Sequence, residues 1–495
     1  MAEHDCTYWR QLREELRIPD AAFINGEFTA ASDGATLTTH YPATGEALGT
    51  VPACTAKDVD RTVVAARAAF EAGNWSQAAP ATRKKVLLRL SALILEHVEE
   101  LALLEALDTG KPISDAFTLD IPGAAGCFAW YAEAIDKMYG EVAPTDSANL
   151  ATITREPLGI VAAVVPWNFP LDITAWKLAP ALAAGNSVIL KPAEQSPLTA
   201  LRLAALAQEA GIPDGVFNVL TGHGHITGQA LGRHADVDCL TFTGSTATGK
   251  RFLEYSSASN MKQVWLECGG KSPNLIFGDC DIDAAAKAAV QGIYFNQGEV
   301  CSANSRILIQ RDAKEAFVER FLAAASELVV GDPLDPATNV GSLIDSSQAD
   351  KVRGYISLGL EEGAHLALGE TPSGEEQGAF VLPTLFHDVT PQMTIAREEI
   401  FGPVAVLIEF DDEDEAVAIA NDSIYGLAAS VWTDNLSRAH RVSRRLRAGT
   451  VSINTVDALD FTTPFGGYKQ SGFGRDLSLH ALDKFTQLKT TWIRL

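Results

Sequence analysis

The chain has 495 residues, 47 % hydrophobic and 21 % charged, a balance typical of a multidomain globular protein and not of a disordered one. Its formal net charge is −24, which argues against nucleic acid or an anionic membrane as a partner. The 7 cysteines are scattered without a Cys-x-x-Cys pair, and no signal-like or membrane-length apolar stretch is visible. We therefore expect a soluble protein with free thiols in the cytoplasm.

The first 150 residues have mostly helical patterns, with apolar residues at three- and four-residue spacing over 59–70 and 83–107. From about residue 158, short β-branched runs alternate with helical stretches. This alternation favours a parallel sheet that is buried on both faces, as in a doubly wound nucleotide-binding domain. The runs are 158–166, 186–192, 215–220, 238–244 and 272–277.

A second α/β pattern follows, and we place the break between the two units near 258–270. Its expected strands are 305–310, 402–410, 427–433 and 449–454, and its expected helices include 313–329 and 413–420. A helix over 478–485 then leads into the β-prone end LKTTWIRL (488–495). A terminal strand without a partner nearby in sequence often pairs across a subunit interface, so we expect an oligomer.

Two motifs point to functions that the rest of the sequence does not support. GSTATGKR (244–251) is close to a P-loop, but Arg251 stands where a hydroxyl would hold Mg²⁺, which disfavours a nucleotide hydrolase. His223 and His225 share one turn without a third ligand, a pattern more typical of a solvated loop than of a metal site. We expect no metal.

Three residues together indicate covalent chemistry on an acyl group. Cys301 lies in a polar stretch before a strand, Glu267 ends an apolar strand beside two glycines, and Asn168 follows another strand in an aromatic turn. A thiol, a carboxylate base and an amide donor are the groups that such chemistry needs. Singly, each also fits a structural role, such as a buried cysteine or a salt-bridged acid. Their joint presence disfavours a catalytically silent binding protein.

The chain resembles the NAD(P)-dependent aldehyde dehydrogenase superfamily, and the resemblance covers nearly its whole length. Within that family it is most similar to bacterial enzymes of polyamine catabolism that oxidise γ-glutamyl-γ-aminobutyraldehyde, guanidinobutyraldehyde and related ω-amino aldehydes, a likeness carried by 131–144 and 474–493. The family motifs are VVPWNFP (164–170), LKPAEQSP (190–197), FTGST (242–246), LECGGKSPN (266–274), NQGEVC (296–301), EEIFGP (398–403) and PFGGYKQSGFGRD (464–476).

The resemblance implies an α/β fold with a Rossmann-type NAD-binding domain, an α/β catalytic domain and a small β oligomerisation arm. We assign 1–128 and 151–262 to the first, 263–477 to the second, and 129–150 with 478–495 to the arm. It also implies a homo-oligomer, either a dimer or a dimer of dimers.

The family's catalytic roles map onto three positions. The resemblance implies that the Cys301 thiol attacks the aldehyde to form a thiohemiacetal, while the Asn168 amide and the Cys301 N–H stabilise the oxyanion. After hydride transfer, Glu267 would activate the water that hydrolyses the thioester. Cys268, where relatives have Leu or Ala, is either a small packing residue or a thiol able to oxidise with Cys301.

The resemblance also implies a cofactor site for NAD. Glu194 would accept the ribose hydroxyls and repel a 2′-phosphate, so NAD is preferred, and Lys191 would tolerate NADP with weaker binding. The residues implied are Val165, Trp167, Lys191, Glu194, Gly224, Gly244, Ser245, Glu399 and Phe401.

Acidic residues near the implied substrate channel favour an aldehyde with a positively charged distal group. Asp172 stands where relatives have an apolar residue, and the substrate loop 454–463 carries Asp457 and Asp460. We rank Asp457 first, then Asp460, then Asp172. Betaine aldehyde or a broad range of aliphatic aldehydes remain alternatives. The expected substrate-binding residues are Phe169, Asp172, Trp176, Asp120, Asp457, Asp460 and Phe465.

Overall fold

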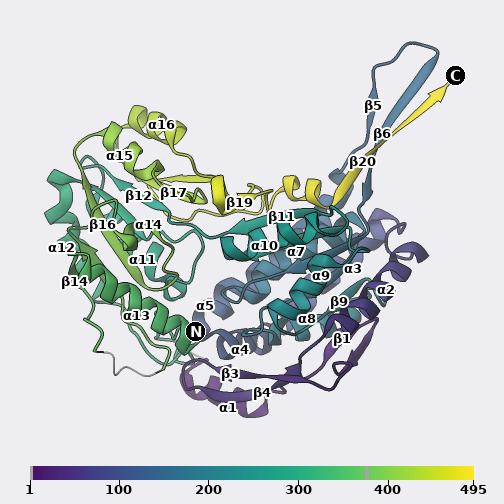
Figure 1. Cartoon of the computed structure of the whole chain (residues 1–495), viewed down its shortest axis with the longest axis horizontal. Coiled ribbons are helices and arrows are strands. Elements are labelled where there is room, and N and C mark those ends of the chain that lie inside the picture. The colour runs from purple at the N-terminus through teal and green to yellow at the C-terminus, as the bar shows by residue number, and fades with distance from the viewer. Residues whose placement is uncertain (1–3, 374–377) are drawn as a thin grey trace.

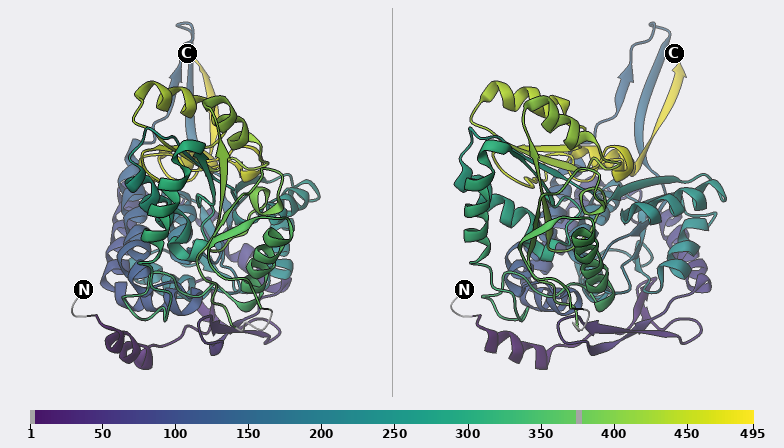
Figure 2. Two further views of the ribbon diagram at one scale, coloured as in Figure 1. Left: turned by 90° about the vertical axis from the view of Figure 1, so that its left-hand side faces the viewer. Right: turned by 60° about the vertical axis from the view of Figure 1, so that its left-hand side comes forward.

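The computed structural model describes residues 4–373 and 378–495. The described chain forms an eight-stranded sheet, a seven-stranded sheet, a three-stranded sheet and a two-stranded hairpin. The two large sheets, each covered by helices, make up the body (Figure 1). The three-stranded sheet projects from the body as an arm, and it does so in the two further views as well (Figure 2).

The eight-stranded sheet has a parallel core that runs in the order β11-β10-β7-β8-β9. Every residue of β7 and β8 is buried, which explains the wholly apolar sequence of β7 and the apolar centre of β8. Antiparallel strands border the core at both edges. The core strands are β7 (Ile160–Val164), β8 (Ser187–Lys191), β9 (Phe217–Val219), β10 (Cys239–Gly244) and β11 (Gln263–Cys268), and the edge strands are β1 (Ala22–Ile24), β2 (Glu27–Thr29) and β19 (Gly472–Phe473).

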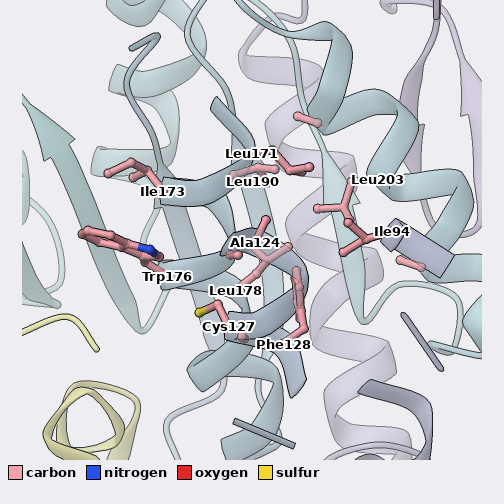
Figure 3. Close-up of a cluster of buried hydrophobic side chains, with 14 of the residues drawn as sticks. Ile94, Ala124, Cys127, Phe128, Leu171, Ile173, Trp176, Leu178, Leu190 and Leu203 are labelled. Carbon is pink, nitrogen blue, oxygen red and sulfur yellow. The ribbon is translucent and has the colours of Figure 1, made fainter. Parts of the chain in front are cut away.

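Two layers of helices pack on one face of this sheet. The inner layer is α7 (Pro170–Ala184) and α8 (Leu198–Ala210), and the outer layer is α3 (Pro80–Glu96), α4 (Val98–Thr109) and α6 (Ile121–Ala134). Figure 3 shows their apolar side chains interlocking, among them Phe128 of α6 and Leu178 of α7. Because α7 lies between the sheet and α6, its charged residues are placed within an apolar core.

The opposite face carries α2 (Ala56–Ala72), α9 (Gln229–Arg233) and α10 (Thr246–Ser257). The chain begins with α1 (Cys6–Glu15), and the hairpin of β3 (Thr36–Tyr41) and β4 (Glu46–Pro52) precedes α2. The sequence predicts mainly helices for the first 150 residues, but the structure also has four short strands between residues 22 and 52.

The seven-stranded sheet is parallel except for its edge strand β14. One face packs against α11 (Ile282–Tyr294) and α12 (Lys314–Ala325). The other packs against α13 (Ser346–Glu361), α14 (Thr394–Arg397), α15 (Glu413–Asn421) and α16 (Leu436–Arg445). In sheet order the strands are β14 (His365–Leu368), β15 (Thr384–His387), β16 (Val404–Phe410), β13 (Arg306–Gln310), β12 (Pro273–Ile276), β17 (Ala428–Trp432) and β18 (Thr450–Ile453).

The chain crosses between the two sheets later than the sequence suggests. β11 pairs in parallel with β10 in the first sheet, so residues 263–268 do not belong with the second unit. The crossing occurs over 269–272, and the run 272–277, expected in the first sheet, forms β12 of the second. Near the C-terminus β19 returns and pairs with β11.

The arm consists of β5 (Glu141–Ala143), β6 (Asn149–Pro157) and β20 (Thr486–Arg494). The terminal strand β20 pairs antiparallel with β6 along its whole length, so its first partner is within its own chain and not a neighbouring subunit. β6 includes residues 151–157, which we had assigned to the NAD-binding domain. Residues 129–134 end α6 and pack in the body instead of the arm. The helix expected over 478–485 is a six-residue 3₁₀ helix, η7 (Leu479–Lys484).

Within the described residues, no helix combines the length and apolar character needed to cross a lipid bilayer.

Candidate active site

A cavity of about 200 Å³ lies where the two units meet. Glu267 reaches it from the end of β11 in the first sheet, and Cys301 reaches it from the loop before β13 in the second. Ligand sites in parallel sheets open at the carboxyl ends of strands, and Glu267 lies at such an end, whereas Cys301 precedes its strand. The lining residues are Pro166, Trp167, Asn168, Ile173, Thr243, Gly244, Ser245, Glu267, Cys268, Gly269, Cys301, Gln348, Lys351, Glu399 and Phe401.

Cys301 follows a strained turn that buried side chains hold in place. Asn296 and Gln297 have φ values of 46° and 56°, in the left-handed region that non-glycine residues rarely adopt. At Gly298 (φ 74°) a Cβ would lie 2.2 Å from the Gly402 carbonyl oxygen, so only glycine fits. The Gln297 side chain accepts a hydrogen bond from Gly341 N at 3.1 Å, which locks the turn into the second unit. Strain of this kind is typical of residues that must be placed accurately.

Asn168 is buried beside this turn with one amide hydrogen to spare. Its Nδ2 donates to the Glu299 carbonyl at 2.7 Å, and its own backbone carbonyl accepts from Asn296 Nδ2 at 3.1 Å. A carboxamide carries two N–H donors, so the second can serve a ligand in the cavity that Asn168 lines together with Cys301. This arrangement suits an oxyanion that develops on a group attached to Cys301.

The Cys301 thiol is held in its protonated form. Burial raises its pKa well above the ordinary value, and the carboxylates of Asp457, Glu399 and Glu267 act in the same direction. A thiol must lose its proton to act as a nucleophile, so this site needs a proton acceptor during attack.

Glu267 is only 4 % exposed, and neither of its carboxylate oxygens has a hydrogen-bond partner among the described residues. Burial, and next the charge of Asp476, raises its pKa to about 8. At Gly466 a Cβ would lie 2.6 Å from Glu267 Oε1, so the absence of a side chain there leaves the carboxylate uncovered. A carboxylate with a pKa near neutrality and free lone pairs is suited to taking a proton from water.

Next to Glu267 lie three buried charged residues that the sequence analysis did not identify. Asp476 accepts hydrogen bonds from both Lys177 of α7 and Lys484 of η7. The two lysines oppose the rise in the Glu267 pKa. Lys177 is the one lysine in a helix that is otherwise almost entirely apolar, and that isolation was a signal available in the sequence.

The cavity continues to a group of residues expected to hold the cofactor. The Glu399 carboxylate accepts from Gly270 N at 3.0 Å, and a Cβ on Gly269 would lie 2.0 Å from it. The ring of Phe401 meets that of Trp167 edge-on at 5.2 Å. Gln348 Nε2 donates to the Phe401 carbonyl at 2.6 Å; neither Gln348 nor Lys351 was expected here, because no motif marks α13.

Ser245 and Gly244 line the same cavity where β10 turns into α10. The Ser245 hydroxyl accepts from Thr248 N at 3.3 Å and caps the helix. The first four backbone N–H groups of a helix have no intrahelical partners, and the helix dipole there favours an anion such as a diphosphate.

Lys191, Glu194, Gly224 and Val165 lie outside this cavity, around the ends of β7 and β8. Lys191 Nζ donates to Glu194 Oε2 at 3.3 Å, and Gly224 N donates to Glu194 Oε1 at 3.5 Å. Val165 N donates to the Lys191 carbonyl at 3.1 Å. A Cβ on Gly224 would meet nothing within 4 Å, so its turn leaves open space beside the Glu194 carboxylate. This set of groups fits a ribose beside the switch point of a doubly wound sheet, which here lies between β7 and β10.

A second buried group of charges, the Lys111 cluster, lies between α7 and the helices outside it. We define it as Lys111 with Glu105, Asp115, Asp120 and Asp172. Lys111 forms an ion pair with Asp120 and lies 3.9 Å from Glu105 Oε1. Burial, and next the Asp120 charge, raises the Asp172 pKa to about 7; burial and Asp120 do the same for Asp115. Four carboxyls thus share one lysine.

Aromatic rings connect the Lys111 cluster to Cys301. Lys111 Nζ lies 4.3 Å from the centre of the Phe169 ring, and that ring stacks on Phe295 at 6.1 Å, just before the Cys301 turn. Trp176 meets Phe465 at 5.5 Å. The expected substrate residues Phe169, Asp172, Trp176 and Asp120 therefore share one region.

The two acids of the substrate loop are separated. The Asp457 carboxylate raises the pKa of the Cys301 thiol, so it lies close to that thiol. Burial raises the pKa of Asp457 itself. Asp460 is exposed and accepts from Thr462 N at 2.8 Å, which makes it part of a local turn. The structure does not bring Asp460 to the other acids, because its carboxylate is engaged within its own loop.

Cys268 packs on α10, its sulfur 3.0 Å from where a Gly249 Cβ would be.

The chain is similar to known proteins along nearly its whole length. Residues 28–491 match the model of the aldehyde dehydrogenase family. The chain is 55 % identical over 493 residues to the NADP/NAD-dependent aldehyde dehydrogenase PuuC of Escherichia coli (strain K12), covering 99 % of each chain. Two solved structures match 99 % of this chain and all of their own. A gamma-glutamyl-gamma-aminobutyraldehyde dehydrogenase from Burkholderia cenocepacia J2315 has TM-score 0.97 at 55 % identity, and an indole-3-acetaldehyde dehydrogenase complexed with NAD+ has TM-score 0.98 at 54 % identity.

Proposed function

The chain belongs to the aldehyde dehydrogenase family, and from that premise we propose how its residues oxidise an aldehyde and which aldehyde they select. It is an NAD-dependent aldehyde dehydrogenase, and the α/β fold expected from the resemblance is confirmed. The roles of the individual residues, the substrate and the assembly are the proposal.

We assign the nucleophile to Cys301. Its sulfur forms a bond to the carbonyl carbon as the thiol proton passes to solvent water, and the carbonyl oxygen becomes an oxyanion that the free Asn168 N–H and the Cys301 backbone N–H stabilise. NAD, when bound, accepts the hydride from this carbon. The acyl group then remains on Cys301 as a thioester.

Glu267 acts in the second half of the reaction. With its pKa near 8, a useful fraction is deprotonated at neutral pH, and it takes a proton from the water that attacks the thioester. The carbon–sulfur bond breaks, the carboxylic acid leaves and the thiol is regenerated. Lys177 and Lys484, both bonded to Asp476, lower the Glu267 pKa and so keep this carboxyl from becoming too weak an acid to ionise.

The substrate proposal rests on one observation: in the Lys111 cluster, four carboxyls share a single lysine. Asp172 and Asp115 are half-buried, so a ligand can approach them. A positively charged distal group on the aldehyde would supply the missing charge, because an unpaired buried carboxylate is costly. An ω-amino, guanidino or γ-glutamylamino butyraldehyde from polyamine breakdown carries such a group, and the Burkholderia relative is named for one of them.

NAD should be preferred to NADP. The Glu194 carboxylate, next to the open side of Gly224, is placed to accept two ribose hydroxyls and to repel a 2′-phosphate. Its partner Lys191 compensates part of that repulsion, so NADP should bind more weakly but still bind.

The assembly should be a homo-oligomer, a dimer of dimers, built through the arm. β20 is at the edge of its sheet, and its residues after Thr486 are exposed, including Trp492 at 65 %. An exposed apolar edge strand is a ready surface for pairing. Deleting residues from Lys489 onward should give smaller species by light scattering, and an unchanged mass would exclude the arm as the interface.

All seven cysteines are free, which supports a reducing compartment such as the cytoplasm.

The function is tested by NADH formation with a panel of aldehydes. The wild type should produce NADH with every aldehyde it binds, with the highest kcat/KM for those carrying a distal cation. Cys301→Ala should lower turnover by a factor on the order of 10⁴ or more while NAD still binds, because the cofactor residues lie elsewhere. Retained turnover in Cys301→Ala would refute the nucleophile. A kcat/KM that is highest for hexanal or betaine aldehyde would refute the proposed butyraldehyde substrate and leave the assignment of the nucleophile untouched.

A further inference from the structure

His365, His387 and Asp388 gather at the edge of the seven-stranded sheet, and none of them lines the active-site cavity. Each offers one donor atom, and the three atoms lie within 4.8 Å of one another. Among the described residues, this is the group of three or more histidine, cysteine or acidic side chains close enough together to hold one ion.

The backbone explains why three residues from two strands share one face. His365 of β14 is the antiparallel partner of His387 of β15, so their side chains stand on the same side of the sheet. Asp388 comes next and would ordinarily point to the opposite side. Its φ of 55° turns it back instead, a left-handed conformation that aspartate tolerates better than most residues. Asp388 Oδ2 consequently lies 2.8 Å from His387 Nδ1 and 3.3 Å from His365 Nδ1.

The two separations between Asp388 Oδ2 and the imidazole nitrogens match those between neighbouring ligands around a small divalent ion, and the two imidazole donor atoms lie within 4.8 Å of each other. With bonds of about 2.0–2.1 Å, adjacent ligands lie roughly 3.3 Å apart in a tetrahedron and roughly 2.9 Å apart in an octahedron. The two imidazole rings are already stacked with centroids 5.6 Å apart, so small rotations would aim both nitrogens at one point. The donors are therefore close to a coordinating geometry.

The groups around Asp388 orient it and leave one oxygen free for an ion. Lys314 Nζ donates to Asp388 Oδ1 at 3.3 Å, on the oxygen that the histidines do not use. The same ammonium donates to Glu409 Oε1 at 2.6 Å, and Glu409 also pairs with Arg311. The cationic charge of Lys314 is thus shared with Glu409. Such outer hydrogen bonds commonly fix the orientation of metal-binding carboxylates.

We propose that His365, His387 and Asp388 form a surface site for a divalent transition-metal ion of the zinc class, completed by water. Two imidazoles and one carboxylate suit Zn²⁺, Co²⁺ or Ni²⁺ better than Mg²⁺ or Ca²⁺, which prefer all-oxygen ligands. A bound ion would tie the edge strand β14 to β15 independently of catalysis.

The probe is Co²⁺, titrated into the full-length protein and followed by its visible absorption. The wild type should bind one Co²⁺ per chain at this site, at least tenfold more tightly than His387→Ala or Asp388→Asn. Asn tolerates the left-handed backbone that Asp388 adopts, so Asp388→Asn removes the charge with little strain. Zn²⁺ should raise the Tm of the wild type and not that of either variant. A thiolate-to-cobalt band in the near ultraviolet would identify any ion bound at a cysteine instead.

His225→Ala is the matched control. His223 and His225 also form a stacked exposed pair, at 5.2 Å, but their nearest carboxylate, Glu194, is 3.9 Å from His223 Nδ1. This control should keep the wild-type affinity. Equal Co²⁺ affinity in the wild type, His387→Ala and Asp388→Asn would overturn the proposal, as would a loss of tight binding in His225→Ala alone.

Discussion

The helix α7 contributes to two buried charge clusters, and the two are composed differently. At the middle of the helix, Lys177 and Lys484 face Asp476 and Glu267, two cations against two acids. Near its first turn, Asp172 belongs to the Lys111 cluster, where one cation faces four acids. In both clusters a lysine is engaged by one aspartate, and a second carboxyl is left with a raised pKa.

The difference in charge balance separates a catalytic group from a binding group. A cluster with equal numbers of cations and acids can hold the pKa of Glu267 near neutral pH without help from a ligand. A general base requires such a pKa. The Lys111 cluster is short of positive charge, and in our account a cationic substrate supplies it. The variants below test this contrast, beginning with the largest expected effect.

Glu267→Gln should separate the two halves of the reaction. The amide cannot take a proton from water, so thioester hydrolysis should slow by a factor on the order of 10²–10⁴ while acylation proceeds. Rapid mixing should show a burst of about one NADH per active site followed by slow turnover. Loss of the burst as well would mean that Glu267 is structural or acts earlier, by deprotonating Cys301.

Lys177→Met should unbalance the first cluster. Lys177 lowers the Glu267 pKa, so its removal should move the acidic limb of the kcat profile to higher pH by about one unit, a roughly tenfold loss at pH 7. Lys177→Arg keeps the charge and should restore the profile. Thermal unfolding reports any general destabilisation, since breaking a buried ion pair is costly. A uniform fall in kcat at every pH would contradict an electrostatic role.

Asp172→Asn should weaken binding of a cationic aldehyde about fivefold, near 1 kcal/mol for a partly buried ion pair. The attraction acts away from the reacting carbon, so the change should appear in KM and leave kcat nearly constant. Asp460→Asn is the matched control, because Asp460 is exposed and engaged by Thr462. Equal KM changes in both variants would remove Asp172 from the substrate site.

The preference for a cationic aldehyde should itself depend on pH. Asp172 has a raised pKa of about 7, so its charged form is minor at pH 6 and dominant at pH 8. The ratio of kcat/KM for a cationic to a neutral aldehyde should rise roughly threefold between these values. Taking the ratio cancels the titration of Glu267, which both substrates share. A ratio that stays flat would place the attracting charge elsewhere.

The sequence predicted the parts of the site that lie in short continuous motifs. Glu267 ends an apolar run, Asn168 follows one and Cys301 precedes one, and the cavity brings all three together. Most of the buried strands of the two large sheets were also predicted, because short apolar runs that are rich in β-branched residues and bounded by glycine, proline or asparagine favour strands. The strand β11 was assigned to the wrong unit because a sheet boundary depends on pairing with β10, which no local pattern records.

Groups assembled from distant residues were not predicted. Asp476 meets Lys177 across 299 positions of the chain, and Gln348 reaches the cavity from a helix without a motif. The position of Asp460, ranked second among the acids, was missed for the same reason. Asp457 and Asp460 are close in sequence, yet one lies near Cys301 and the other is held in an exposed turn.

One measurement tests most directly whether the Lys111 cluster selects a cation. 4-(Trimethylammonio)butanal and 5,5-dimethylhexanal have the same shape, and they differ in whether nitrogen with a positive charge or neutral carbon carries the three methyl groups. We predict that the wild type at pH 8 has a kcat/KM several-fold higher for the cationic aldehyde, about fivefold for an ion pair worth about 1 kcal/mol, and that Asp172→Asn removes most of the difference. A ratio of one or less in the wild type would contradict the account.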